Sequence, residues 1–541
     1  MSGDGGGGGG GDERPLLGAN CDLNDVQALL EETDRRRWRS IRVMYLTMFL
    51  SSVGFSIVMS SIWPFLQKVD PSSSPTFLGW VLASYSLAQL FACPALGAWA
   101  NARGSSMPLL TSMLLGTAGH VMYMYAHAVH SRGRFLVLAA RIFLGLGAGN
   151  VAVVRAFASA ATNMEERTPV MANLSACQAL GFILGPVLQT VLTWVGEEGV
   201  SWPPLALQLN MYTAPALLGA ALTLANAILV TCAFWEQKFK TDNSSADSDT
   251  PMSLNLLAVI TSNILFFVTL FIFTVFETIA TPLSMHMFAW SRGQAVLYDG
   301  LLLAGLGLQA IGVFMAAKPL TPRLGERLLL VVGLVLVLAG YVVLLPWGHQ
   351  LPPLAWQTID NITESPSSTT ASLTGLSTIA PSVQMLKSDD GSGQGCPFIS
   401  QPWCLHVPVI RLAQFICGLV LIGAGYPLCT LTTYSLYSKI LGDRPQGVFM
   451  GWLTASGSLA RVLGPMFVAQ AYVRAGPRIA FGSVAAVVAA ALGLLLATYP
   501  HLRPLTPAVM SPEHNEPLSH SPESTIMADP SDCDQRLPLL D

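Results

Sequence analysis

The chain has 541 residues, of which 52% are hydrophobic and only 11% charged, and its formal net charge at pH 7 is −4. Soluble domains carry about 25% charged residues, so this composition excludes an ordinary water-soluble protein. The slightly acidic balance offers no basic surface for a nucleic-acid partner. A spanning helix needs about 20 apolar residues, so the length accommodates about a dozen spans, with the lipid bilayer as the main partner.

Apolar runs in the chain predict twelve membrane spans, and an even number places both ends on one side. Five arginines lie between positions 35 and 42, directly before the first span, and most basic residues of the short loops fall on the same side. The positive-inside rule therefore predicts cytosolic termini. The predicted spans are 43–66, 77–100, 108–129, 135–158, 170–194, 211–234, 255–279, 297–317, 328–346, 408–434, 446–472 and 479–499.

These spans divide the chain into five predicted parts, each with its own environment. They are a cytosolic N-terminal tail (1–42), a six-helix bundle (43–235), a polar cytosolic linker (236–254), a second six-helix bundle (255–499) and a cytosolic C-terminal tail (500–541). The second bundle contains a long loop on the far side from the termini, at 348–407, rich in Ser, Thr, Pro and Gly.

The long loop carries two candidate modifications. Asn361 begins an Asn-Ile-Thr glycosylation sequon on the face that the topology makes lumenal. Cys396 and Cys404 lie near the end of the loop. In an oxidising compartment they would form a disulfide that closes a short loop, and the alternative is two free thiols.

The two predicted bundles echo each other in sequence. Gly147-Ala148-Gly149 in the fourth span matches Gly423-Ala424-Gly425 in the tenth, and Gly185-Pro186 in the fifth matches Gly464-Pro465 in the eleventh. Glycine permits close helix approach, and proline after glycine permits a bend beside a cavity. Two matching six-span halves predict a transport site between them, near the middle of the bilayer.

Three motifs resemble those of the major facilitator superfamily. Gly97-Ala98-Trp99-Ala100-Asn101-Ala102-Arg103-Gly104 is similar to its cytosolic gating motif, although Asn101 stands where the family usually has Asp. Arg141 with Gly145, Gly147 and Gly149 resembles its arginine–glycine motif, and Gly181-x-x-x-Gly185-Pro186 resembles its antiporter-type motif. The resemblance implies an all-α, twelve-span membrane fold of two pseudo-symmetric six-helix bundles.

Longer stretches, such as GAGNVAVVRAF and CQALGFILGP, resemble a lysosomal branch of this superfamily that is linked to neuronal ceroid lipofuscinosis. That resemblance implies a lysosomal or late-endosomal membrane, a glycosylated lumenal loop and chloride conduction. A local signal agrees with this address. Asp12 lies four residues before Leu16-Leu17, an acidic-dileucine pattern whose carboxylate and leucines can dock the basic patch and apolar pocket of a sorting adaptor.

Five ionisable residues fall within or near predicted spans, where each charge costs about 2.5–3.5 kcal/mol unless it faces an interior. They are Arg141, Arg155, Glu277, Arg411 and Arg461. Four are arginines, so a shared cavity would be positive and would favour an anion. Each has an ordinary alternative: Arg141 a structural hydrogen bond, Arg155 and Arg411 snorkelling at span ends, and Glu277 the partner of an arginine rather than a protonatable coupling group.

No nucleotide-binding loop, hydrolase elbow or zinc-spaced cysteine set occurs in the chain. We therefore expect no enzyme, no catalytic residue, no metal and no cofactor. The leading hypothesis is a lysosomal transport protein that moves a small anion, chloride first. The alternatives are a proton-coupled exporter of an organic solute and a non-transporting membrane scaffold, which the altered gating motif at Asn101 favours.

Overall fold

The computed structural model describes residues 23–73, 75–129, 132–196, 198–202, 207–236, 255–355, 385–386, 395–398, 401–442 and 444–503. Residues 39–505 belong to one compact unit and residues 23–38 to another. Within 23–38, Glu32 pairs with Arg36 and Asp34 with Arg37, each at 2.6 Å. The predicted sorting residues Asp12, Leu16 and Leu17 and the sequon at Asn361 lie outside the described residues.

The first half of the compact unit is a helical bundle with one β-hairpin. In it α4 packs against α5 and α8, and α3 packs against α5. Its helices are α1 (Leu23–Ser56), α2 (Ile62–Val69), α3 (Pro75–Arg103), α4 (Ser106–Met124), α5 (Gly133–Gly147), α6 (Asn150–Ala160), α7 (Met164–Leu192) and α8 (Ala214–Ala233), with 3-10 turns η1 (Met59–Ser61), η2 (Tyr125–Ala128) and η3 (Thr193–Val195) and antiparallel strands β1 (Val200–Trp202) and β2 (Leu207–Leu209).

The second half is a bundle in which α9 packs against α13 and α11 against α12. Its helices are α9 (Leu256–Phe288), α10 (Arg292–Leu324), α11 (Glu326–Leu344), α12 (Leu412–Leu441) and α13 (Gly447–Thr498), with a 3-10 turn η6 (Pro402–Leu405) and two-residue parallel strands β3 (Leu354–Ala355) and β4 (Met385–Leu386).

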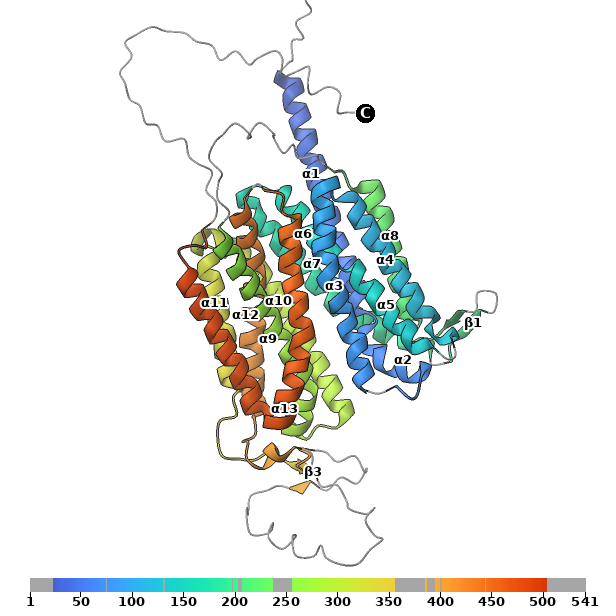
Figure 1. The fold of residues 1–541 in the computed structure, drawn as a ribbon, viewed down its shortest axis with the longest axis vertical. Helices are drawn as coiled ribbons and strands as arrows, with labels where there is room; N and C mark the ends of the chain where they lie inside the picture. The colour runs from blue at the N-terminus through green and yellow to red at the C-terminus, as the bar shows by residue number, and fades with distance from the viewer. Residues whose placement is uncertain are drawn as a thin grey trace, which may run out of the picture. The chain divides into compact units, whose positions relative to one another are not determined.

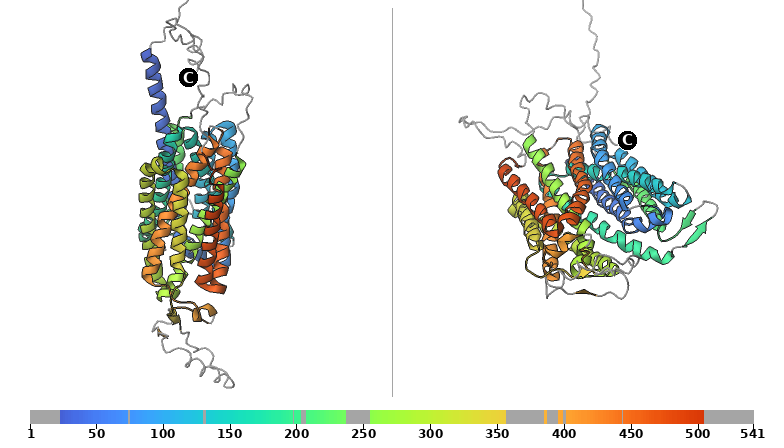
Figure 2. Two further views of the ribbon diagram at one scale, coloured as in Figure 1. Left: turned by 90° about the vertical axis from the view of Figure 1, so that its left-hand side faces the viewer. Right: turned by 60° about the horizontal axis from the view of Figure 1, so that its bottom comes forward.

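The two halves lie side by side with their long helices roughly parallel (Figures 1 and 2). The principal contacts between them are α3 against α13 and α7 against α10. Ser40 bonds to Trp235, and Asn255 to His501, so residues near both ends of the compact unit lie on one side. We call this side the terminal face, and the side with β1, β2 and η6 the opposite face.

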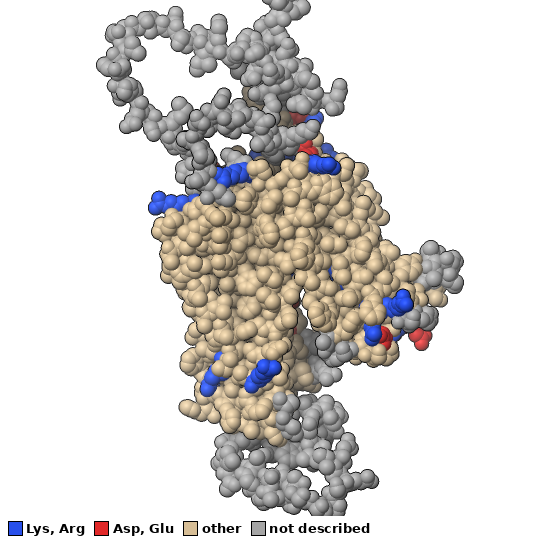
Figure 3. All heavy atoms as spheres, viewed as in Figure 1, with Lys and Arg blue, Asp and Glu red and all other residues tan. Residues whose placement is uncertain are grey.

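The predicted all-α, twelve-span fold is confirmed. Nine helices in the described residues are long and apolar enough to span a bilayer. One of them, α13, is two helices that meet at Gly476, where φ is 76°, and α1 and α4 run alongside the rest to complete twelve. On the face in Figure 3, charged side chains gather toward the two ends of the unit, and the band between them is uncharged, as a bilayer requires.

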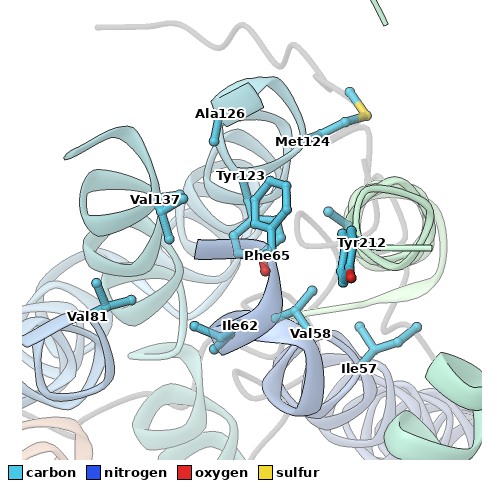
Figure 4. Packing of buried hydrophobic residues seen from close by; sticks show 12 residues of the cluster. Ile57, Val58, Ile62, Phe65, Val81, Tyr123, Met124, Ala126, Val137 and Tyr212 are labelled. Carbon is cyan, nitrogen blue, oxygen red and sulfur yellow. The ribbon is translucent and has the colours of Figure 1, made fainter. Parts of the chain in front are cut away.

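Two spans are less regular than predicted. The first is not one helix over 43–66, because α1 ends at Ser56 and the chain continues through η1 into α2. The fourth breaks between α5 and α6, where the weak helix formers Gly147-Ala148-Gly149 lie. Around the first break, Phe65 of α2 packs on Tyr123 and Tyr212, with ring centres 4.7 and 5.9 Å away (Figure 4). This apolar cluster anchors α2 to the bundle.

A disulfide-closed segment caps the second half on the opposite face. Cys396 and Cys404 are joined by a disulfide, and the Cys396 amide donates to the carbonyl oxygen of Pro353 at 2.7 Å. Trp403, between them, packs against the kink of α13, where a Cβ on Gly476 would lie 2.8 Å from the indole ring. The segment therefore holds the point at which the last two spans meet.

Candidate functional site

Arg155 joins the two halves in the middle of the unit. It lies in α6, is 1% exposed, and its Nη2 donates to Gln178 Oε1 at 2.9 Å. Its guanidinium carbon lies 3.7 Å from the ring centre of Tyr434, which belongs to α12 in the other half. A desolvated cation over an aromatic ring gains about 2 kcal/mol or more. Because the side chain is fully buried, the snorkelling alternative for Arg155 is wrong.

Arg461 of α13 lies in the same region and is partly buried. It interacts electrostatically with Tyr426 and Tyr434 of α12, with Tyr85 of α3, and with Glu277 of α9. Arg155 interacts with the same two tyrosines of α12. The structure therefore brings Arg155, Arg461 and Glu277 around one aromatic pair at the boundary of the halves.

Glu277 is exposed, although it lies about three helical turns before the end of α9. No ion pair within 4.0 Å joins it to Arg461 or to another described residue, so the charge of Arg461 acts on it from a distance. An exposed carboxylate deep within a bundle must face a solvated space. Glu277 therefore marks the hollow between the halves, and it is not locked in a structural salt bridge.

Arg141 is held differently, inside the first half. It lies in α5, is 1% exposed, and its Nη2 contacts Met59 Sδ at 3.4 Å. Its guanidinium group lies 4.8 Å from the ring of Tyr85 and 5.8 Å from that of Phe55. Tyr85 also interacts with Arg461. Arg141 thus supports the wall of the site through Tyr85 and does not line the hollow itself.

Arg411 lies apart from the other candidates. It is the residue before α12, is exposed, and its backbone N–H accepts no share in the central cluster but donates to Gln414 Oε1 at 3.4 Å. The structure thus places it at a helix end, as its snorkelling alternative predicts. It serves below as a control position.

The motif at the end of α3 closes the terminal face through uncharged contacts. The Gly447 amide at the start of α13 donates to Asn101 Oδ1 at 2.8 Å, and Asn101 Nδ2 donates to the Pro445 carbonyl at 3.4 Å. A Cβ on Gly97 would overlap the backbone of Gly447, so α3 and α13 touch there. Arg103, which ends α3, is exposed. Asn101 therefore supplies the contact without a charge.

A second set of contacts joins the halves on the terminal face. Arg167 Nη1 donates to the Ser438 carbonyl at 3.1 Å, and the Thr168 hydroxyl donates to Glu326 Oε1 at 2.9 Å. Glu326 is also paired with Lys439. Among pairs of described residues, the side-chain hydrogen bonds between the halves extend from this face only as deep as Ser458 and Gln89, whose bond is 3.1 Å.

The remaining glycines predicted to permit close packing all lie at helix contacts. A Cβ would lie 2.8 Å from Ala88 at Gly145, 2.8 Å from Leu96 at Gly149, 2.6 Å from Ser52 at Gly181, 2.8 Å from Ile57 at Gly185 and 2.6 Å from Thr274 at Gly464. Pro186 and Pro465 follow the last two inside α7 and α13. Proline removes a helical hydrogen bond at each point, so both helices can bend beside the hollow.

Away from the terminal face the halves separate. Figure 3 shows a hollow between them that opens toward the opposite face. The molecule is therefore closed on one side and open on the other. Groups of three or more metal-ligating side chains do not occur in the described residues.

The sequence reasoning missed four residues of this region. Tyr85, Tyr426 and Tyr434 read as ordinary packing residues because each lies in an apolar run, although Gly425-Tyr426-Pro427 follows directly on the repeat that singled out Gly423. Asp299 was overlooked as an intramembrane acid, although it lies in the predicted span 297–317 and is 4% exposed in α10.

The chain resembles known membrane transporters along most of its length. Residues 44–390 match the model of the Major Facilitator Superfamily. Major facilitator superfamily domain-containing protein 8 of Xenopus laevis is 48% identical over 498 residues, covering 88% of this chain and 94% of that protein. Major facilitator superfamily domain-containing protein 10 of Bos taurus is 24% identical, covering 80% and 81%.

Solved structures show the same fold. The human organic anion transporter MFSD10 (TETRAN) aligns with a TM-score of 0.58 at 19% identity, over 85% of this chain and 99% of that one. The transporter FucP in the outward conformation aligns with a TM-score of 0.56 at 12% identity, over 86% and 98%. With two six-span halves around a central hollow, this chain is a multi-pass membrane protein and belongs to the Major Facilitator Superfamily of transporters.

Proposed function

We propose that this protein carries a small anion across its membrane by alternating access between its two halves. One observation carries the proposal. Arg155 from the first half and Arg461 from the second meet at the same pair of tyrosines, and Glu277 is the single acidic group that interacts with them among the described residues. Arginine stays charged in proteins, so this region has an excess of positive charge.

The arrangement of contacts supports a carrier mechanism. The terminal face is closed by hydrogen bonds between the halves, whereas the hollow opens toward the opposite face. An anion that enters from the open side neutralises part of the charge of Arg461. This lowers the cost of burying that charge when the halves rock and the open side closes. The contacts of Asn101, Arg167 and Thr168 must then break to release the anion.

For the cargo we propose chloride first, because the chain resembles a lysosomal branch of the family, and an organic anion second. The second choice follows the name of the human transporter that shares this fold. We place the protein in the lysosomal and endosomal membrane with cytosolic termini. Asp12, Leu16 and Leu17 would bind a sorting adaptor, and Asn361 would carry a glycan in the lumen.

The test is anion flux in proteoliposomes that contain the purified full-length protein. Arg461→Ala should lower chloride or organic-anion flux at least tenfold, and Arg461→Lys should retain part of it because the charge is kept. Arg411→Ala removes an equal charge at an exposed helix end and should leave flux within twofold. Unchanged flux in Arg461→Ala would contradict the proposal, and no flux of any anion or solute would favour the scaffold alternative.

A second candidate function, proton-coupled export of an organic solute, is favoured by the exposure of Glu277 next to Arg461. A carboxyl group that faces water in an otherwise apolar region can exchange a proton with that water. Glu277→Gln should then leave solute exchange intact and remove its dependence on a pH gradient. Flux that keeps its full pH dependence in this variant would exclude Glu277 as the coupling group.

A further inference from the structure

Asp299 is an acid buried inside the second half, away from the arginines. It lies about two turns into α10, is 4% exposed, and packs against α9 where Pro282 interrupts that helix. Its Oδ2 lies 2.9 Å from the hydroxyl of Ser284. The hydroxyl of Thr281 approaches the same carboxyl group, but Oδ1 makes no hydrogen bond of normal geometry.

The hydrogen bonds of Ser284 indicate which atom carries the proton. Its hydroxyl oxygen lies 2.9 Å from the Thr281 carbonyl oxygen and 2.9 Å from Asp299 Oδ2. A hydroxyl has one proton to donate, so it cannot donate to both acceptors. Both contacts are satisfied if Asp299 is protonated, because it then donates to Ser284 Oγ while Ser284 donates to the Thr281 carbonyl.

The surroundings also disfavour an ionised Asp299. Among the described residues, no charged side chain interacts with it. On α9, Glu277 interacts with Arg461, and His286 Nδ1 lies 3.0 Å from the Tyr472 hydroxyl. On α10 itself, the ring of Tyr298 packs on Trp290. A buried carboxylate without a partner is strongly disfavoured.

The other helices that pack on α10 do not supply a counter-charge either. On α11, Tyr341 donates to the Ile272 carbonyl. On α12, Tyr426 and Tyr434 interact with the arginines of the central site. The charged groups of α7, α11 and α12 lie near the terminal face, at Glu165, Glu166, Arg167, Glu326, Arg327 and Lys439.

A chain of polar groups connects Asp299 to the hollow. Glu277 and Thr281 are four residues apart on α9 and so share one face of that helix. Pro282 has no N–H, so the Thr278 carbonyl lacks its helical donor and is free to bind a proton donor such as water. Exposed Glu277 can thus exchange protons with water, and Thr281 leads from it to Asp299.

We propose that Asp299 is a proton-binding site, protonated in this conformation and exchanging its proton with the hollow past Thr281 and Glu277. One proton leaves Asp299 as H⁺ and passes to water, and the carboxylate that remains is stabilised by the hydroxyls of Ser284 and Thr281. The role of this proton in coupling rests on the transport function proposed above, whereas the protonation of Asp299 does not.

Infrared spectroscopy of the purified full-length protein at about neutral pH tests the protonation directly. Wild type should show the C=O band of a protonated carboxylic acid, and Asp299→Asn should lose that band, since the amide mimics the protonated acid in shape and as a donor. Asp70→Asn, which removes an exposed acid, should leave it unchanged. If Asp299→Asn does not fold, Ser284→Ala should shift the band. A band that neither variant alters, or no band in wild type, overturns the proposal.

Proteoliposomes test the coupling separately. A solute gradient should drive proton movement in wild type but at least tenfold less in Asp299→Asn, while solute exchange persists. If the infrared result holds but no variant or wild type moves any solute, the proton site stands and the proposed function fails. If Asp299→Asn moves protons as well as wild type, the coupling role of Asp299 is excluded.

Discussion

The contact between α3 and α13 gives a quantitative prediction about the conformational equilibrium. Gly451 of α13 lies against α3, and a Cβ on it would lie 2.7 Å from the Cys93 carbonyl oxygen and 2.7 Å from Pro94 Cα. Ordinary contact begins at 3.4 Å, so Gly451→Ala requires the two backbones to separate by about 0.7 Å, which is 3.4 minus 2.7. Backbone atoms cannot rotate aside as a flexible side chain can.

That separation weakens the nearby hydrogen bonds between the halves. The bond from Gly447 to Asn101 would lengthen from 2.8 Å to about 3.5 Å, and that from Ser458 to Gln89 from 3.1 Å to about 3.8 Å. Neither would then be an effective hydrogen bond. At about 0.5–1.5 kcal/mol each, their loss biases the equilibrium by about 1–3 kcal/mol, roughly 5- to 150-fold, toward the state that is open at the terminal face.

Double electron–electron resonance measures this shift. Spin labels at Glu165 and Arg323, which are exposed on the terminal face of the two halves, should move apart in a larger fraction of molecules in Gly451→Ala. Gly493→Ala, on the same helix, is the control because nothing lies within 4 Å of its Cβ position. The same distance distribution in wild type and Gly451→Ala, or the same shift in both variants, would refute the reasoning.

Three further predictions concern other contacts. Tyr434→Leu removes the ring under Arg155 and should lower transport roughly tenfold or more, whereas Tyr434→Phe keeps the ring and should stay close to wild type in the same flux assay. Cys396→Ser opens the disulfide-closed cap and should destabilise it by about 2 kcal/mol, measured as faster proteolysis there than in the wild type under non-reducing conditions. Hydrogen bonds from Ser72 hold the pKa of Asp70 below its usual range, so the stability that ionised Asp70 contributes is complete above about pH 4 and is lost as the pH falls further; the melting-temperature difference between wild type and Asp70→Asn should be equal at about pH 7 and pH 5 and smaller at about pH 3.

The sequence predicted those features that depend on local composition. The spans follow from runs of apolar residues, and the close helix contacts at Gly97, Gly181 and Gly185 follow from the absence of a side chain at those positions. The echo between Gly185-Pro186 and Gly464-Pro465 predicted that two halves would face each other. These signals lie within one span, so they survive without knowledge of the neighbours.

The sequence did not distinguish among the intramembrane arginines, because each has the same local context of apolar residues. Arg141, Arg155 and Arg461 differ only in what surrounds them: Tyr85 and Met59 for the first, Tyr434 for the second, and an electrostatic interaction with Glu277 for the third. These partners come from helices far away in the chain. Their approach depends on how each helix is rotated about its axis, which hydropathy does not specify.

By itself, therefore, the sequence determined that the chain lies in a membrane, that it crosses about twelve times, and that two similar halves enclose a site with excess positive charge. Only the tertiary structure decided that the molecule is closed at the terminal face, that Arg141 is a wall residue, and that Asp299 shares its hydroxyl partner with a backbone carbonyl. The physical reason is that desolvation acts on each residue along the chain, whereas hydrogen bonds and charge pairs require two groups that only folding brings together.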